Sequence, residues 1–204
     1  MNGNSKNKLG LAGLAGALTL IAFGCTARKS PRQFILSDLK PVSQQAERPL
    51  KRDIYIEEFT IASEYSRLPF VYRMSPYQLR YDTVRKWAVP PEDMVRERVH
   101  AYFKKSGMFT NVTMRYGIQL PSLFLKGHVL KIGEKLEEEK RFAELAFELE
   151  LVDPNSGKTL WKSTKSREKE VGIIFFEPVI KALSECLREI LDECAAELQK
   201  ELSP

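Results

Sequence analysis

Few residues of this sequence have the type and spacing that catalysis requires. The two histidines, His100 and His128, belong to no His-Glu-x-x-His pattern, and no Gly-x-Ser-x-Gly segment occurs. Cys186 and Cys194 do not have the Cys-x-x-Cys spacing of redox or metal sites, and the chain lacks the Gly-x-x-x-x-Gly-Lys-Ser/Thr loop that cradles nucleotide phosphates. We therefore expect no enzyme, no metal site and no cofactor. A site built from carboxylates alone is the remaining catalytic alternative.

A third cysteine, Cys25, lies where covalent modification is expected. Residues 1–24 contain no acidic side chain, carry Lys6 and Lys8, and are uncharged over the fifteen residues 9–23. This pattern is typical of a secretory signal, and it is shorter than the roughly 20 apolar residues of a membrane-spanning helix. A small residue followed by Cys at its end resembles the processing site of bacterial lipoproteins. We therefore expect residues 1–24 to be removed and the Cys25 thiol to carry a covalent lipid that anchors the chain to a membrane.

The neighbours of Cys25 refine this expectation. Ala22 and Phe23 stand where lipoprotein signals more often have Leu and a small residue, so an ordinary signal peptide is the alternative. In lipoproteins of bacteria with two membranes, Asp directly after the modified Cys favours the inner membrane. Thr26 occupies that place here and predicts the outer membrane. Residues 25–32 are expected to form a lipidated tether, and residues 33–204 a periplasmic domain.

The composition favours one domain with a packed core. The chain has 204 residues, of which 43% are hydrophobic and 29% charged. Its 32 basic and 27 acidic residues give a net charge of +5, which becomes +3 (30 against 27) without Lys6 and Lys8. A nucleic-acid partner normally requires a dense basic stripe, so this scattered excess predicts none. Three cysteines are too few for a fold built on disulfides.

Alternation of hydrophobic and polar residues predicts a sheet. In residues 141–152, Ala143, Leu145 and Phe147 share one face, and glutamates occupy the other. The turn formers of 153–158 predict a hairpin to 160–167, and the charged run 135–141 predicts a wet loop. Residues 70–73 and 78–81 predict a second hairpin with a four-residue connection. Further strands are expected at 34–36, 53–59, around Val112 and at 123–132, and residues 40–52 are expected to be loose.

Two helices are predicted to cover one face of this sheet. Pro91 begins the first and Gly107 ends it, which places a helix over residues 91–106. Residues 177–202 carry a hydrophobic stripe at helical spacing. Cys186 and Cys194 lie on or beside that stripe about 12 Å apart along the axis, so we expect two buried thiols and no disulfide. The predicted fold class is α/β in the α+β sense: a single domain with a mostly antiparallel or mixed sheet and helices on one face.

The order of motifs in residues 68–112 is more specific than their secondary structure. In chain order they are a strand ending in Tyr72-Arg73, a strand containing Tyr81, the step Trp87-Ala88-Val89-Pro90-Pro91 into a helix, and the exit Ser106-Gly107-Met108-Phe109. This order resembles the ABC-type transport auxiliary lipoproteins, which include the paraquat-inducible protein C lipoproteins. The resemblance extends more weakly over residues 33–200. It departs from the family at the processing site and at 34–36, where the family more often begins with Tyr-x-Leu.

The resemblance implies a lipid-tethered periplasmic domain that serves an ABC permease and ATPase together with a substrate-binding protein of the mammalian-cell-entry type. Such systems move phospholipid or other hydrophobic molecules between two membranes. The implied role is docking or ring-like support by a homo-oligomer, with ATP hydrolysis left to another subunit. A lipoprotein scaffold for another envelope assembly, without a transport role, is the alternative.

Aromatic residues and arginines are the candidates for partner contact. Tyr72, Arg73 and Trp87 have the composition of interface hot spots, and the alternative is that the large rings fill a junction in the interior. Arg73 and Arg80 are either ligands for lipid phosphate or solvated charges. The apolar run that ends in Ile173, Ile174, Phe175 and Phe176 is either a lipid- or subunit-contacting loop or a buried lead-in to the last helix.

Overall fold

The computed structural model describes residues 30–39, 49–115, 117, 120–172 and 175–202. The predicted leader and anchor, residues 1–24 and Cys25, lie outside these residues, as do Ile173 and Ile174 of the predicted contact loop. Within the described residues, no helix combines the length and the apolarity needed to cross a membrane.

A long antiparallel hairpin, β7 (Leu123–Glu137) and β8 (Lys140–Val152), is the centre of the sheet. β9 (Thr159–Val171) pairs with the other edge of β8, also antiparallel. The predicted alternation in β8 is confirmed, because Leu145, Phe147 and Leu149 are all buried. This face of β7, β8 and β9 therefore forms one side of the hydrophobic core.

The charged run 135–141 belongs to the hairpin strands and is not the predicted loop. Only Glu138 and Glu139 turn, both with positive φ (47° and 66°). Ion pairs explain the difference, because Lys135 Nζ lies 2.8 Å from Glu137 and 3.1 Å from Glu168 of β9. The charges of the run are thus compatible with strand structure, since they pair with one another across the sheet.

The other edge of β7 is shared by two groups of strands. Near the β7–β8 turn it pairs with β4 (Pro69–Ser75), which continues to β5 (Gln78–Trp87) and β1 (Arg32–Phe34). Toward its start it pairs with β3 (Thr60–Ile61) and with β2 (Leu50–Ile56), which continues to β6 (Phe109–Thr113). β4 and β5 are antiparallel, whereas the pairs made by β1, β2, β3 and β6 are parallel. The nine strands of the described chain form one mixed sheet, as predicted.

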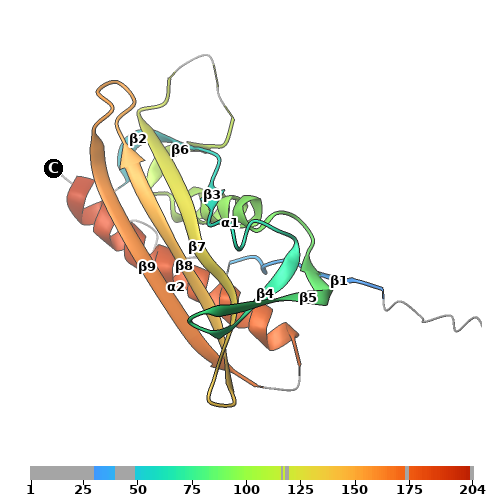
Figure 1. The fold of residues 1–204 in the computed structure, drawn as a ribbon. Helices are drawn as coiled ribbons and strands as arrows, with labels where there is room; N and C mark the ends of the chain where they lie inside the picture. The colour runs from blue at the N-terminus through green and yellow to red at the C-terminus, as the bar shows by residue number, and fades with distance from the viewer. Residues whose placement is uncertain (1–29, 40–48, 116, 118–119, 173–174, 203–204) are drawn as a thin grey trace, which may run out of the picture.

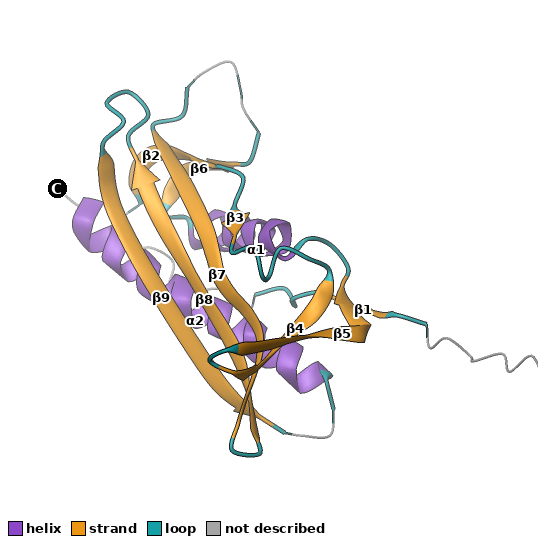
Figure 2. Cartoon of the chain, in the orientation of Figure 1, coloured by secondary structure: helices purple, strands orange, loops and turns teal. Residues whose placement is uncertain are grey.

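Two helices cover one face of this sheet, which confirms the prediction (Figure 1). α1 (Pro91–Ser106) ends at Gly107 in the left-handed conformation (φ 62°), and α2 (Glu177–Leu202) runs along β8 and β9 (Figure 2). The Tyr102 hydroxyl of α1 donates to Asp192 Oδ1 of α2 at 2.9 Å. Sheet and helices enclose a single hydrophobic core.

Several short segments differ from the prediction. β1 covers Arg32–Phe34 and not 34–36, because these three residues pair with β5, and β2 ends at Ile56 and not at residue 59. The β4–β5 connection is the two-residue turn Pro76-Tyr77, not four residues. β2 begins at Leu50, inside the segment expected to be loose, because the Leu50 N–H donates to the Met108 carbonyl at 2.7 Å and fixes the strand beside β6. β3 was not predicted, since two residues carry no period of their own.

Candidate functional site

Five aromatic rings meet where β1, β4, β5 and the residue before α2 converge. The Phe70 ring centroid lies 4.9 Å from Trp87, 4.7 Å from Phe176 and 5.7 Å from Tyr72. Phe34 completes the group at 4.5 Å from Phe176. We call these five residues the aromatic socket. The structure thus brings together Tyr72, Trp87 and Phe176, three residues that the sequence offered as partner contacts.

The rings of the socket face the interior. Trp87 is 1% exposed, and Tyr72 and Phe176 are also buried. Trp87 and Tyr72 therefore fill the junction between hairpin and helix, which is the interior alternative that the sequence left open. For Phe176, the alternative of a buried residue that leads into the last helix is likewise the one that the structure shows. Phe175, in contrast, is 68% exposed and remains a predicted contact residue.

A bulge in β5 aims one guanidinium at the socket. The β4–β5 register shifts at this point. Asp82 holds the bulge, because its Oδ1 accepts the backbone N–H groups of Val84 and Arg85, each at 2.7 Å. Asp82 Oδ2 accepts Arg85 Nε–H at 2.7 Å and also the Tyr72 hydroxyl. The Arg85 guanidinium then lies over the Phe176 ring, 4.6 Å from its centroid, in a cation–π contact.

Burial and hydrogen bonds set the protonation of this network. Burial alone would raise the pKa of Asp82, but the Arg85 N–H, the Tyr72 hydroxyl and the Val84 N–H together hold it below its ordinary value. Burial, followed by the hydrogen bond to Asp82, raises the pKa of Tyr72. The Tyr72 hydroxyl therefore stays protonated and serves as a hydrogen-bond donor.

A second carboxylate, Glu134 of β7, is fully buried next to Tyr72 in the sheet register. Arg141 Nε and Nη2 both lie 2.7 Å from its Oε2, whereas Oε1 has no hydrogen-bond partner in the described part of the chain. Burial raises the pKa of Glu134, although Arg141 opposes that effect. Arg141 also donates to the Gly172 carbonyl at 3.3 Å. The pair therefore ties the end of β9 to the β7–β8 hairpin.

Arg73 lies on the other face of the sheet, in an ion-pair network that the sequence did not predict. Its Nε is 3.0 Å from Glu144 Oε2, and Lys131 Nζ is 2.7 Å from Oε1 of the same carboxylate. Glu144 is buried, and Arg73 also donates to the Tyr65 hydroxyl. The solvated-charge alternative is therefore wrong for Arg73, because its guanidinium neutralises a buried carboxylate. Arg80 is exposed and remains a candidate for phosphate contact.

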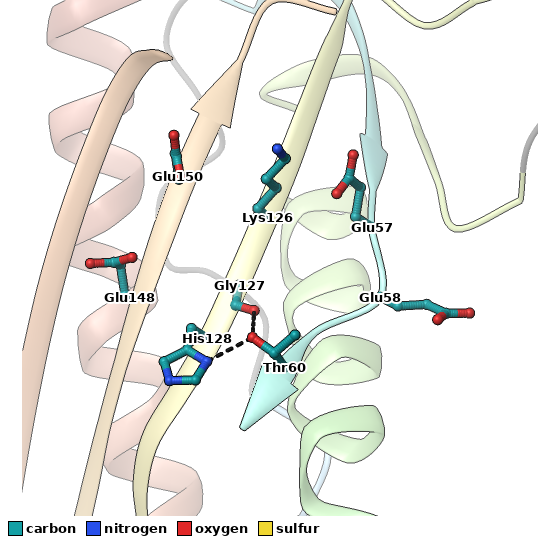
Figure 3. Close-up of a pocket in the computed structure, with 8 residues that line it drawn as sticks. All are labelled: Glu57, Glu58, Thr60, Lys126, Gly127, His128, Glu148 and Glu150. Carbon is teal, nitrogen blue, oxygen red and sulfur yellow. Dashed lines mark hydrogen bonds between the residues drawn. The ribbon is translucent and has the colours of Figure 1, made fainter. Parts of the chain in front are cut away.

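An open hollow of about 260 Å³ is lined by polar side chains on the solvent-exposed face of the sheet, opposite the helices (Figure 3). Its lining residues are Glu57, Glu58, Thr60, Lys126, Gly127, His128, Glu148 and Glu150. Thr60 Oγ1 and His128 Nδ1 lie 2.7 Å apart, which is the spacing of a hydroxyl and its base. Glu148, however, bonds to Lys162 and Thr164, so this carboxylate does not orient the imidazole as the third member of a triad would. Among the described residues, no group of His, Cys, Asp and Glu is arranged to hold a metal.

The two cysteines of α2 are interior residues. Cys186 and Cys194 are both buried and free. Burial raises the pKa of each thiol to about 12. The prediction of two buried thiols without a disulfide between them is confirmed.

Three of the exposed apolar side chains belong to the β4–β5 hairpin. The most exposed is Tyr77, at 98%, in the turn of the β4–β5 hairpin, and Met74 and Tyr81 flank it. We call these three residues the hairpin tip. Tyr77 was not among the predicted contact residues, because residues 74–77 were predicted only to connect two strands. The signal was an aromatic residue where a tight turn normally has Gly, Asn or Asp.

Comparison with known proteins identifies the fold. No family model matches the chain, and no curated protein matches it. A Xanthomonas campestris protein of the DUF330 family is 15% identical, with 84% of this chain and 94% of that chain covered and a TM-score of 0.67. The structure of an uncharacterized protein is 14% identical, with 83% and 99% covered and a TM-score of 0.67. A hypothetical protein of Chlamydia trachomatis is 5% identical, with 75% and 98% covered and a TM-score of 0.51. At these identities the likeness shows a shared fold alone.

Proposed function

We propose that this protein is a lipid-anchored periplasmic lipoprotein and an auxiliary subunit of an ABC transporter with a mammalian-cell-entry-type partner. The system would move lipids or other hydrophobic molecules. In this proposal the lipid on Cys25 holds the domain at the outer membrane, and Thr26 after that residue favours this location. The domain catalyses no reaction and docks on the transport machinery, alone or as a ring of copies, while another subunit hydrolyses ATP.

The main support for the proposal is the position in the fold of the motifs that resemble the transport auxiliary lipoproteins. Tyr72 and Trp87 build the aromatic socket, Pro91 begins α1, and Gly107 ends it. These four motif residues have structural roles, so this part of the resemblance concerns residues that help to specify the fold. The solved DUF330 structure shares this fold over 84% of this chain.

The hairpin tip is the contact surface in this proposal. Tyr, Met and Arg are enriched where proteins meet, and Arg80 lies beside the tip without an ion-pair partner among the described residues. Tyr77 adds a large side chain at almost full exposure. Burial of such a ring against a partner is a main source of binding free energy at interfaces.

Site-specific crosslinking tests the proposal in intact cells. A photo-crosslinking amino acid replaces Tyr77 in the full chain, and the proteins that it captures are identified by mass spectrometry. We expect a permease or a mammalian-cell-entry-type protein among the adducts. The same amino acid at Glu139, in the turn of the β7–β8 hairpin, is the matched control and should not capture them. Capture of unrelated assembly factors alone would contradict the transport role and favour the scaffold alternative.

A further inference from the structure

A second group of exposed apolar side chains surrounds β1. Phe175 is 68% exposed, Ile35 47% and Val89 36%. They come from three distant parts of the sequence. We call these three residues the β1 surface.

Contacts between their chain neighbours bring the three residues together. Phe34, Ala88 and Phe176 precede or follow them directly. The Phe34 and Phe176 rings lie 4.5 Å apart, and the Ala88 N–H donates to the Phe34 carbonyl at 2.9 Å. Figure 1 shows β1, the end of β5 and the start of α2 on the same side of the molecule. The β1 surface is therefore one local patch.

The socket holds Phe176, the neighbour of one residue of this patch, in the interior. Phe176 is held between Phe70, at 4.7 Å, and the Arg85 guanidinium, at 4.6 Å. Phe175 directly precedes Phe176, so its exposed side chain lies next to a side chain that the socket holds. Covering such an exposed phenyl ring with another apolar phase is favourable, because it removes apolar surface from water.

Cations accompany the patch. Arg32 and Lys86 lie on β1 and β5, and neither has an ion-pair partner within the described ranges. The cations on β9 differ, since Lys165, Arg167 and Lys169 are all paired with glutamates of α2. Asp38, three residues after Ile35, pairs with Arg98, and Glu177 is the acidic residue that directly follows the socket. Arg32 and Lys86, the cations without such a partner, complement anionic lipid headgroups.

The predicted tether places this patch close to a bilayer. Arg32, the first residue of β1, follows Cys25 by seven residues. Seven residues span at most about 25 Å even when fully extended. Whatever membrane holds Cys25 must therefore lie within that distance of β1.

We propose that the β1 surface rests in the headgroup region of the bilayer that holds the Cys25 lipid. Phe175 and Ile35 lie at the boundary of the acyl chains, and Arg32 and Lys86 contact anionic headgroups. This inference rests on the lipid anchor of the proposed function. It gives the domain a membrane side, distinct from the hairpin tip.

Depth-dependent quenching of single labels tests this orientation. The full-length protein, processed in the cell, is reconstituted in vesicles of phosphatidylcholine and phosphatidylglycerol that carry nitroxide lipids. An environment-sensitive fluorophore is attached to Phe175→Cys or Ile35→Cys, since Cys186 and Cys194 are buried and the Cys25 thiol is expected to be blocked. Ser166→Cys, exposed on β9, is the matched control. We expect blue-shifted emission and strong quenching at Phe175 and Ile35, and neither at Ser166.

The outcomes separate the orientation from the anchor. Quenching at Phe175 that weakens in phosphatidylcholine alone, or with Arg32→Glu and Lys86→Glu, supports the proposal. Equal quenching at Phe175 and Ser166 overturns it, as does a Phe175 label that reports contact with a second copy and not with lipid. Protein that is not retained by the vesicles at all shows that the anchor itself has failed, and the proposed function with it.

Discussion

Among the described glycines, Gly133 of β7 has the least room for a side chain. A Cβ at this position would lie 2.4 Å from the Val71 carbonyl oxygen of β4. Because a main-chain atom cannot swing aside, Gly133→Ala must push β4 away from β7. We expect the free energy of unfolding to fall by about 1–3 kcal/mol, measured by urea denaturation. Gly172→Ala is the control, since a Cβ there meets no atom within 4 Å; equal losses in both variants would contradict this account.

Asp82 gives the protein a predictable response to acid. Its pKa is held below the ordinary 3.8 in the folded state, so the unfolded state binds a proton more readily. The stability that Asp82 contributes is therefore complete above that value and is lost as the pH falls through the folded pKa. Asp82→Asn should lower the free energy of unfolding by about 1–3 kcal/mol near neutral pH, because a charged acceptor of several hydrogen bonds is lost.

The pH dependence distinguishes this effect from simple damage to the bulge. The difference in the free energy of unfolding between wild type and Asp82→Asn should narrow when urea denaturation is repeated near pH 3, because the unfolded carboxylate binds a proton below its ordinary pKa of 3.8. Asp53→Asn removes a carboxylate without an ion pair among the described residues and serves as the control. A gap that stays constant from neutral to acid pH would show that charge on Asp82 contributes nothing.

At the residue scale, the sequence predicted what depends on local pattern. Cys186 and Cys194 lie on a hydrophobic stripe, so their burial followed from spacing. The task of Gly133 could not be predicted, because it depends on which strand approaches β7 at that point. The partner role offered for Trp87 met a similar limit, since composition alone does not distinguish a ring in the interior from one on the surface.

At the scale of elements, two charged stripes join β9 to α2. Lys165, Arg167 and Lys169 point toward the helix and pair with glutamates four residues apart, Glu185, Glu189, Glu193 and Glu197. These inward-pointing cations also make the free edge of β9 unattractive to another strand. We call this set of ion pairs the β9–α2 seam.

Charge reversal tests the β9–α2 seam. Arg167→Glu places its carboxylate beside Glu193 and should lower the free energy of unfolding by about 1 kcal/mol or less, because both partners are partly exposed. The loss should shrink at high salt. Adding Glu193→Arg restores opposite charges and should recover part of the stability in urea denaturation. A double variant no more stable than Arg167→Glu alone would mean that the pair contributes nothing measurable.

The sequence specified most elements because their periods are strong. The alternation of β8 and the helical stripe of α2 each repeat over many residues. The prediction of a loop at 135–141 was wrong, because the charge of Lys135 is paired with Glu168 of β9. No local pattern in the sequence reveals that pairing. The start of β2 at Leu50 was not predicted for the same reason, because a long-range hydrogen bond to Met108 defines it.

At the scale of the whole molecule, the two proposals give one domain two contact sides. Tyr77 of the hairpin tip and Phe175 of the β1 surface are both exposed, and they are the residues proposed to contact a partner and a bilayer. Of these, the sequence predicted only the apolar run that contains Phe175. Tyr77 required the two-residue turn, and the β1 surface required the contact between Phe34 and Phe176, which are distant in the chain.

The central claim is that lipid on Cys25, and not an embedded helix, holds this domain at a membrane. The intact mass of the mature protein extracted from membranes tests it most directly. The account predicts a chain that begins at Cys25 and carries the added mass of covalent acyl chains, which the Cys25→Ser variant should lack. A mature chain with an unmodified first residue, or one that still contains residues 1–24, would contradict the account.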